Sequence, residues 1–118
     1  MVANIDFGPT FLDAAGLPVP GEMHGRSMVS ILKGQTPADW RKSFYYHYYE
    51  YPGPHDVPRH YGLVTERHKL VHFYEPQFSY WELFDLKNDP QELKSIYGQA
   101  DSAALQKDRK STRLNSSH

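Results

Sequence analysis

The sequence lacks cysteine, an excess of positive charge and any long apolar run. Without cysteine, it can form neither disulfide bonds nor thiolate metal sites. The formal net charge is −1, so no surplus of positive charge would attract a nucleic-acid backbone. No apolar run approaches the roughly 20 residues that a membrane-spanning helix needs, and the first residues lack the basic start and apolar core of a signal peptide. The sequence therefore predicts no nucleic-acid or membrane partner, and an export signal would lie outside this chain.

What the sequence does contain is an unusual share of aromatic residues. Its 118 residues are enough for one small domain at most. Hydrophobic residues make up 39% of the chain, which is low for an independent globule, whereas aromatic residues make up 14% and include nine tyrosines. Each tyrosine hydroxyl needs a hydrogen-bond partner or water. This composition is typical of a surface that lines a groove.

Two short helices are predicted in the first third of the chain. Residues 11–16 follow Pro9 and end at Gly16, the pattern of a helix that starts near a proline and stops at a glycine. A second short helix is predicted after Ser27, whose hydroxyl can cap it, and it should end at Gly34. The apolar residues of this part exceed what two short helices can bury, so we expect them to need a partner outside this chain.

The second part of the chain has the pattern of an antiparallel sheet. The segment SFYYHYYEY places aromatic side chains on both faces of a strand. Two further apolar runs form a hairpin about Arg67 and His68, and the next run alternates with a period of two. Strands that follow one another so closely pair as antiparallel neighbours. The predicted strands are residues 43–51, 61–66, 69–74 and 80–86.

A helix is predicted directly after the fourth strand. Asp89 can act as its N-terminal cap, Pro90 suits the first helical position, and Glu92 can complete a capping box. We therefore expect a helix over residues 90–97 that closes one face of the sheet. Residues 101–110 can continue helically.

Several motifs occur in the same order as in a known family. ELFDL followed by DPQE, the segment NIDFGPTFLDAAGLPVP, and the stretches HGRSMVSILKG and YGLVTERHKLVHFY are each similar to an element near the carboxyl terminus of the sulfatases. These enzymes are sulfate-ester hydrolases with an alkaline-phosphatase-like fold. The resemblance covers roughly residues 4–98, and several collinear segments are more specific than any single motif.

The resemblance implies an α+β carboxyl-terminal fragment of an alkaline-phosphatase-like α/β sulfatase. Residues 1–41 would be the end of the large domain, with its two short helices and a linker. Residues 42–109 would be a subdomain made of a small four-stranded antiparallel sheet and a packed helix. Residues 110–118 are polar without periodicity, which predicts a disordered or non-native tail. The chain would pack against the N-terminal sulfatase domain, and periplasmic, extracellular or lysosomal export would fit the longer protein.

The same resemblance implies hydrolysis of sulfate esters, most simply those of sulfated glycans, with a formylglycine nucleophile and a calcium ion. The chain itself has no cysteine, no serine in the required context, and no grouped carboxylates of the kind that hold calcium. The sequence therefore predicts no catalytic residue, no metal ligand and no activity for this chain alone. The alternatives are a non-catalytic carbohydrate-binding β module and a fragment of a phosphatase or phosphodiesterase relative.

In the sulfatases, as the resemblance implies, loops of this subdomain border the substrate pocket. Arg59 can pair with a sugar carboxylate or a second sulfate, while histidines and Glu50 can bind hydroxyls. The alternative for each is a structural role, because a strand histidine is commonly a core residue with a satisfied hydrogen bond. The predicted substrate-binding residues are His47, Glu50, His55, Arg59 and His60.

Overall fold

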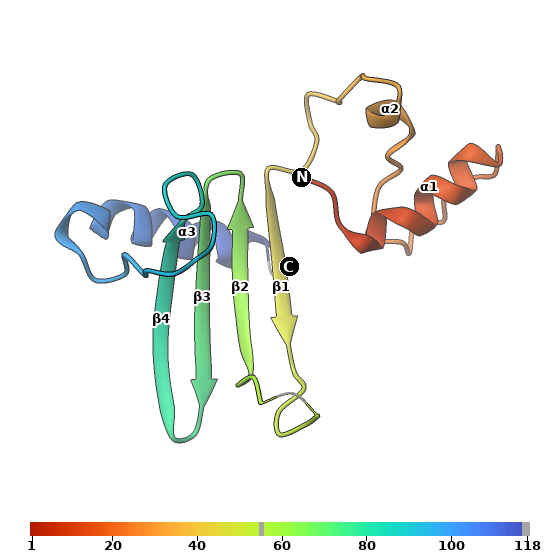
Figure 1. The fold of residues 1–118 in the computed structure, drawn as a ribbon. Helices are drawn as coiled ribbons and strands as arrows, with labels where there is room; N and C mark the ends of the chain where they lie inside the picture. The colour runs from red at the N-terminus through yellow and green to blue at the C-terminus, as the bar shows by residue number, and fades with distance from the viewer. Residues whose placement is uncertain (55, 117–118) are drawn as a thin grey trace. The chain divides into compact units, whose positions relative to one another are not determined.

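The computed structural model describes residues 1–54 and 56–116, and it divides the chain into two compact units, Met1–Arg41 and Lys42–His118 (Figure 1). The first unit contains the 3-10 helix η1 (Asn4–Asp6) and the helices α1 (Phe7–Ala14) and α2 (Val29–Leu32). The second contains the strands β1 (Ser43–Tyr48), β2 (His60–Thr65), β3 (His68–Glu75) and β4 (Phe78–Asp85), followed by the 3-10 helix η2 (Ala100–Ser102) and the helix α3 (Ala103–Ser116). No helix among the described residues has the length and apolarity needed to cross a bilayer.

The two predicted short helices are present in the first unit. Helix α1 begins at Phe7, earlier than expected, and ends where the sequence predicts. Gly16 follows it with a φ of 74°, a left-handed conformation that suits glycine at a helix end. Near the start of α2, the hydroxyl of Ser27 accepts a hydrogen bond from the backbone nitrogen of Val29 at 3.2 Å, but the cap position itself is Met28, one residue later than expected.

A buried carboxylate connects distant parts of the first unit. Asp6 is fully buried, and its oxygens accept hydrogen bonds from the backbone nitrogens of Ala3 at 2.8 Å and Arg26 at 2.9 Å. The guanidinium of Arg41 donates two more, each of 2.9 Å. This bidentate pair satisfies the buried charge and holds the pKa of Asp6 well below its usual range.

The apolar side chains of the first unit are largely exposed. Phe7 and Phe11 stack at a centroid distance of 6.4 Å, yet they are 52% and 70% exposed. Ile5, Leu17 and Leu32 are exposed as well. As expected from the sequence, this unit does not enclose its own apolar side chains.

The second unit is built on the predicted four-stranded antiparallel sheet, with the strand order β1-β2-β3-β4. Leu63, Leu70 and Leu83 lie opposite one another on β2, β3 and β4 and are almost completely buried. Helix α3 contacts β1, β2 and β3 and lies behind the sheet in Figure 1. These leucines form the apolar core of the unit.

The predicted helix over residues 90–97 does not form. The carboxylate of Asp89 accepts hydrogen bonds from the backbone nitrogens of Leu93 and Lys94 at 3.1 and 2.9 Å, four and five residues further on, so it closes a wider turn and does not cap a helix. Glu92 also has a φ of 56°, which no α-helix accommodates. Its carboxylate is held instead by the amine of Lys69 at 2.9 Å.

The same segment runs along the outer edge of β4, and we call residues 86–99 the strap. The hydroxyl of Ser95 accepts a hydrogen bond from the backbone nitrogen of Leu83 at 3.0 Å. The backbone nitrogen of Ile96 donates to the carbonyl of Leu83 at 2.8 Å. Pairing with a sheet edge thus satisfies backbone groups that a helix would have satisfied internally.

The helix that packs on the sheet is α3. Ser102 precedes it and is buried, with its hydroxyl donating to the carbonyl of Ile96 at 2.7 Å. The sequence predicts a disordered or non-native tail over residues 110–118, whereas α3 continues to Ser116. Residues 117–118 lie outside the described residues.

Candidate functional site

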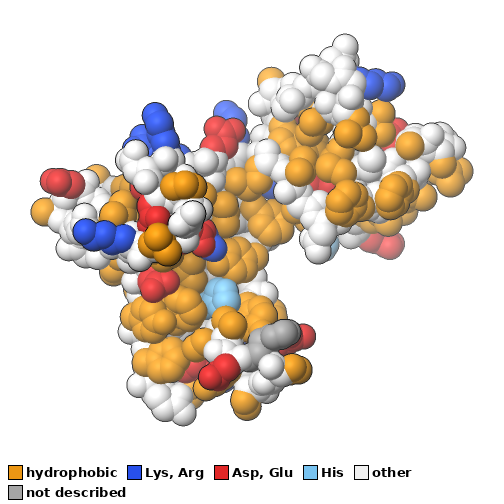
Figure 2. All heavy atoms as spheres, in the orientation of Figure 1, with side chains coloured by type: hydrophobic (Ala, Val, Ile, Leu, Met, Phe, Trp, Pro, Cys, Tyr) orange, Lys and Arg blue, Asp and Glu red, His pale blue; other side chains and the backbone are white. Residues whose placement is uncertain are grey.

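Alternation along the strands divides the side chains of the second unit between two faces of the sheet. The covered face lies under α3, where the amine of Lys110 is 4.4 Å from the ring centre of Trp81. No described helix of this unit crosses the other face, which we call the open face (Figure 1). In Figure 2, hydrophobic side chains gather on this face over the lower parts of β3 and β4. The side chains of the open face are Phe44, Tyr46, Tyr48, His60, Val64, Lys69, Val71, Phe73, Glu75, Phe78, Tyr80, Glu82 and Phe84, with Gly62 among them on β2. The segment after β4 reaches this face at Lys69, whose amine pairs with Glu92.

A row of rings crosses the open face next to the loop that joins β1 to β2. Strand pairing places Tyr48, His60, Phe73 and Tyr80 side by side. The ring of His60 stacks on Tyr48 at a centroid distance of 5.2 Å and lies 5.1 Å from Phe73. Phe73 in turn stacks on Tyr80 at 4.7 Å. The sheet therefore fixes the orientation of the His60 ring between aromatic neighbours.

The hydrogen bond of His60 also defines which ring nitrogen is available. Its Nδ1 lies 2.8 Å from the carbonyl oxygen of Pro58. A carbonyl can only accept, so Nδ1 carries the proton of this bond. In the neutral ring, Nε2 is then the nitrogen that can accept a hydrogen bond.

Arg59, the residue before His60, is held by a buried carboxylate. Glu75 is 5% exposed, and it accepts hydrogen bonds from the Nε and Nη2 of Arg59, both at 3.0 Å. The backbone nitrogen of Arg59 donates to the same carboxylate at 2.9 Å. These bonds lower the pKa of Glu75. Arg59 keeps the N–H groups of Nη1 for a further anionic acceptor.

A second row on the open face depends on a glycine. Tyr46, Gly62, Val71 and Glu82 lie side by side on the four strands. A Cβ atom at Gly62 would come within 2.6 Å of the Tyr46 ring, so only glycine lets this ring lie flat over β2. Burial, and then the charges of Glu92 and Glu82, raise the pKa of Tyr46 to about 12.

The structure separates the predicted site residues. His47 lies on the covered face, where its Nε2 contacts the hydroxyl of Tyr74 and its ring stacks on Tyr49 at 3.9 Å. Burial lowers the pKa of His47. It therefore cannot share a ligand on the open face with His60. Glu50 is exposed just beyond β1, and His55 lies outside the described residues.

Arg59 and His60 are thus the predicted residues that the structure brings together. The sequence analysis did not single out Glu75, the partner of Arg59, or Glu82, which lies on the open face. The sequence could have identified Glu82, because the alternation of the fourth strand puts it on the same face as Tyr80. It could not have identified Glu75 as the partner of Arg59, because that pairing depends on the register between β2 and β3.

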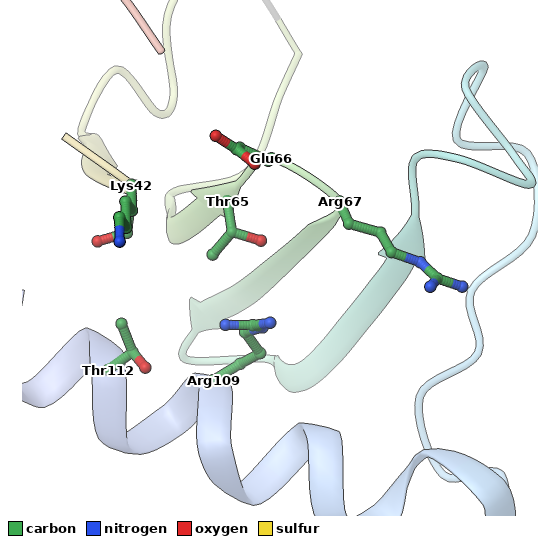
Figure 3. Close-up of a pocket in the computed structure, with 7 residues that line it drawn as sticks. Lys42, Thr65, Glu66, Arg67, Arg109 and Thr112 are labelled. Carbon is green, nitrogen blue, oxygen red and sulfur yellow. The ribbon is translucent and has the colours of Figure 1, made fainter. Parts of the chain in front are cut away.

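A hollow of about 460 Å³ lies at the end of the sheet where β1 begins and β2 ends, away from the loop that joins these two strands (Figure 3). Its basic side chains include Arg67, which is already paired with Asp85 at 2.9 Å. Of the predicted substrate-binding residues that the structure describes, His47, Glu50, Arg59 and His60, none lines this hollow. The residues that line it are Lys42, Ser43, Thr65, Glu66, Arg67, Arg109 and Thr112.

Among the described residues, no group of three or more His, Cys, Asp or Glu side chains could hold a metal ion. The calcium ion implied by the resemblance therefore has no fitting donor set in this part of the protein. Formylglycine does not fit either, because the sequence has no cysteine and no serine in the required context.

Comparisons with known proteins agree with the motifs. Residues 1–117 match the family model of the N-sulphoglucosamine sulphohydrolase C-terminal domain. The chain is 52% identical over 107 residues to an N-acetylglucosamine-6-O-sulfatase of Bacteroides thetaiotaomicron, a match that covers 89% of this chain and 19% of that protein. It is 31% identical over 118 residues to the multifunctional alkaline phosphatase superfamily protein PehA of Trinickia caryophylli, covering 89% of this chain and 22% of that protein.

A solved structure shares the fold of this chain. The structure of BT4656 in complex with its substrate D-glucosamine-2-N,6-O-disulfate superimposes with a TM-score of 0.87 at 48% identity, covering 93% of this chain and 22% of that chain. The chain thus spans about a fifth of the length of the relatives it matches. With this fold, these motifs and these matches, the chain belongs to the family of sulfatase carboxyl-terminal domains in the alkaline-phosphatase-like superfamily.

Proposed function

We propose that this chain is the carboxyl-terminal part of a sulfatase that hydrolyses the 6-O-sulfate ester of an N-substituted glucosamine. The proposal rests on the identity with the N-acetylglucosamine-6-O-sulfatase, which extends over most of this chain. The likeness to the structure bound to a glucosamine disulfate supports a sulfated sugar as the substrate. Because the sequence has no cysteine, and no serine in the formylglycine context, to supply the nucleophile, we expect the chain to need the rest of the longer protein for activity.

Within the longer enzyme, the loop between β1 and β2 contributes to the rim of the substrate pocket. Arg59 binds a sulfate or carboxylate through its remaining N–H groups, and the Nε2 of His60 accepts a hydrogen bond from a sugar hydroxyl. Glu50 and His55 belong to the same loop and are proposed as further rim residues. His47 contributes less directly, because its ring belongs to the covered face and supports β1.

The calcium ion and the formylglycine are assigned to the other parts of the longer protein. There they supply the nucleophile and offset the charge that the sulfate oxygens gain in the transition state. The residues of this chain orient the sugar.

Sulfate release by the intact protein tests the proposed reaction. We expect hydrolysis of N-acetylglucosamine-6-sulfate, with much slower hydrolysis of a 2-O-sulfated hexuronate and of a phosphonate monoester. Hydrolysis of the phosphonate alone would favour the phosphatase alternative. Binding of the sulfated sugar without any release of sulfate would favour the non-catalytic carbohydrate-binding module.

Replacing His60 tests the rim. His60→Ala in the intact enzyme removes one neutral hydrogen bond, whose net value is about 1–1.5 kcal/mol, and we therefore expect KM to rise about tenfold with kcat little changed. His24→Ala is the matched control, because His24 is an exposed histidine of the first unit. An equal KM for the His60 variant and the wild type would remove His60 from the pocket.

A further inference from the structure

Glu75 is a buried carboxylate at the end of β3 that binds both the backbone and the side chain of Arg59. One of its oxygens accepts hydrogen bonds from the backbone nitrogen and from Nε of Arg59, and the other accepts from Nη2. The side chain of Glu75 is 2% exposed, whereas that of Arg59 is 38% exposed. Burying a carboxylate is costly, and a buried ion pair rarely stabilises a fold more than an apolar pair would. The stability of the sheet therefore does not explain why a carboxylate lies here.

The ion pair fixes the direction of the guanidinium. Nε and Nη2 form one side of its planar fork, and Glu75 takes one N–H group from each. The N–H groups that Glu75 does not use are the two on Nη1 and the second one on Nη2. The outer N–H groups of Nη1 and Nη2 are parallel, which is the geometry that binds two oxygens of a sulfate or a carboxylate. Glu75 thus leaves the end of the fork for a second anion.

The backbone around Arg59 is held by the sheet as well. The carbonyl of Arg59 accepts a hydrogen bond from the backbone nitrogen of Tyr74 at 3.3 Å, and its nitrogen donates to Glu75. The carbonyl of the preceding Pro58 is bonded to the ring of His60 at 2.8 Å. Little ordering therefore remains to be done when a ligand binds, which favours affinity and a defined direction.

We propose that Glu75 is a positioning residue for the substrate, because it directs the outer N–H groups of Arg59 to a second anionic group of the sugar, distinct from the sulfate ester that is hydrolysed. This inference rests on the proposed function, in which Arg59 belongs to the rim of the pocket. A sulfate on the sugar nitrogen and the carboxylate of a neighbouring uronate both present two oxygens to such a fork. Since Glu75 already balances the charge of Arg59, the selection depends on the direction of these N–H groups.

The substitution Glu75→Gln in the intact enzyme tests this inference with three substrates. N-acetylglucosamine-6-sulfate has no second anion, glucosamine-2-N,6-O-disulfate has a second sulfate, and a disaccharide of a uronate and N-acetylglucosamine-6-sulfate has a carboxylate. We expect KM for one of the two doubly charged sugars to rise about tenfold with kcat unchanged, because a directed hydrogen bond to a charged group is lost. The sugar that responds identifies the second anion. KM for the singly charged sugar should stay within about twofold.

The freed charge of Arg59 does not offset this loss, since an undirected ion pair at an exposed site contributes little. Asp85→Asn is the matched control. Asp85 holds Arg67 through the same two nitrogens, Nε at 3.1 Å and Nη2 at 2.9 Å, at the opposite end of the strands from Glu75. This control should lower the thermal midpoint without changing the ratio of the KM values among the sugars.

Arg59→Lys is a second variant that keeps the fold. Lysine retains a charge next to the buried Glu75 but has no fork, so we expect the same rise in KM for the same sugar. Adding Glu75→Gln to the Arg59→Lys protein should cause no further rise, because Glu75 acts through the fork of Arg59. A further rise would overturn the positioning role. An unchanged KM ratio for Arg59→Lys would also overturn it, even if the Gln variant fails to accumulate.

Two more results would contradict the inference: an equal change of KM for all three sugars, and no change for any of them. A failure of the proposed function is detected separately. The sugars without their 6-sulfate bind without turnover, so calorimetry gives the ratio of their dissociation constants in wild type and in Glu75→Gln. An intact protein that shows the expected change in this ratio but releases no sulfate would contradict the proposed function and support the role of Glu75. Sulfate release with an unchanged ratio would do the reverse.

Discussion

The two units differ in what they bury most deeply. In the first unit it is the carboxylate of Asp6, and in the second unit it is the side chains of three leucines in a row across the sheet. Asp6 is fully buried while Phe11 is 70% exposed. By contrast, Leu63 and Leu83 are completely buried. The first unit is therefore held largely by the hydrogen bonds of Asp6 and by the buried ring of Trp40, while its exposed phenylalanines contribute little within the unit. The second unit has a core of its own and leaves mainly one aromatic face bare.

This difference indicates what each unit needs from the longer protein. The exposed phenylalanines of α1 would gain their stabilisation only when covered, since burying a side chain of this size contributes about 1.5–3 kcal/mol. The sheet already gains that energy from its leucines. The two tryptophans, Trp40 in the first unit and Trp81 in the second, allow each unit to be followed separately in the intact chain through their indole N–H signals.

The largest expected effect is the loss of a core leucine. Leu83→Ala should destabilise the second unit by about 2–5 kcal/mol, because it leaves a cavity in a fully buried row. Urea titration monitored by the indole signal of Trp81 measures this loss. Leu32→Ala in the first unit is the control, since Leu32 is 76% exposed and should change stability by less than about 0.5 kcal/mol. Similar losses for the two variants would contradict the contrast between the units.

The second effect concerns the network of the first unit. Asp6→Asn removes the charge that pairs with Arg41 and replaces one acceptor by a donor, which should cost about 1–3 kcal/mol. The indole N–H of Trp40, which donates to the carbonyl of Met1 at 2.6 Å, should shift or broaden, while the signal of Trp81 stays unchanged. Glu22→Gln is a suitable control because Glu22 is an exposed carboxylate of the same unit. A shift of the Trp81 signal alone would show that Asp6 does not act within its own unit.

The smallest effect is a difference in acid sensitivity. Burial lowers the pKa of His47 and His72 in the folded second unit, so the unfolded chain binds protons more readily. The contribution of these two histidines to the stability of the unit is therefore fully present above the unfolded pKa of about 6.5, and it is lost as the pH falls from there through their lower folded pKa. The pKa of Asp6 is also lowered, mainly by Arg41, but its unfolded value is about 4, so the first unit should keep its stability down to that pH.

Urea midpoints at pH 7 and pH 5 measure this difference. The midpoint reported by Trp81 should fall, while the midpoint reported by Trp40 stays constant. His72→Gln should make the fall shallower. An equal fall for both tryptophans would show that the buried histidines do not account for it.

Local sequence patterns predicted the sheet well. Aromatic and β-branched alternation found all four strands, and the same alternation put His47 and Tyr48 on opposite faces, as the structure does. The end of α1 at Gly16 was predicted in the same way, from a glycine that follows the helix. Features of this kind depend only on residues that are neighbours in the sequence.

Features that depend on distant residues were not predictable in this way. Asp6 is buried because Arg26 and Arg41, 20 and 35 residues further along the chain, donate to it. The capping pattern at Asp89 predicted a helix, but this segment instead forms a hydrogen bond with Leu83 and an ion pair between Glu92 and Lys69. Both outcomes are decided by tertiary contacts, against which a local propensity of a few tenths of a kcal/mol per residue is weak.

The strap also bears on how this sheet avoids aggregation. An outermost strand with free backbone groups is a template on which another chain can polymerise. At Leu83 the backbone N–H is bonded to Ser95 and the backbone carbonyl to Ile96. These two groups of β4 are therefore not free to pair with a strand of another chain. Any tendency of this chain to precipitate should therefore originate at the tyrosine-rich β1, on the far side of the sheet.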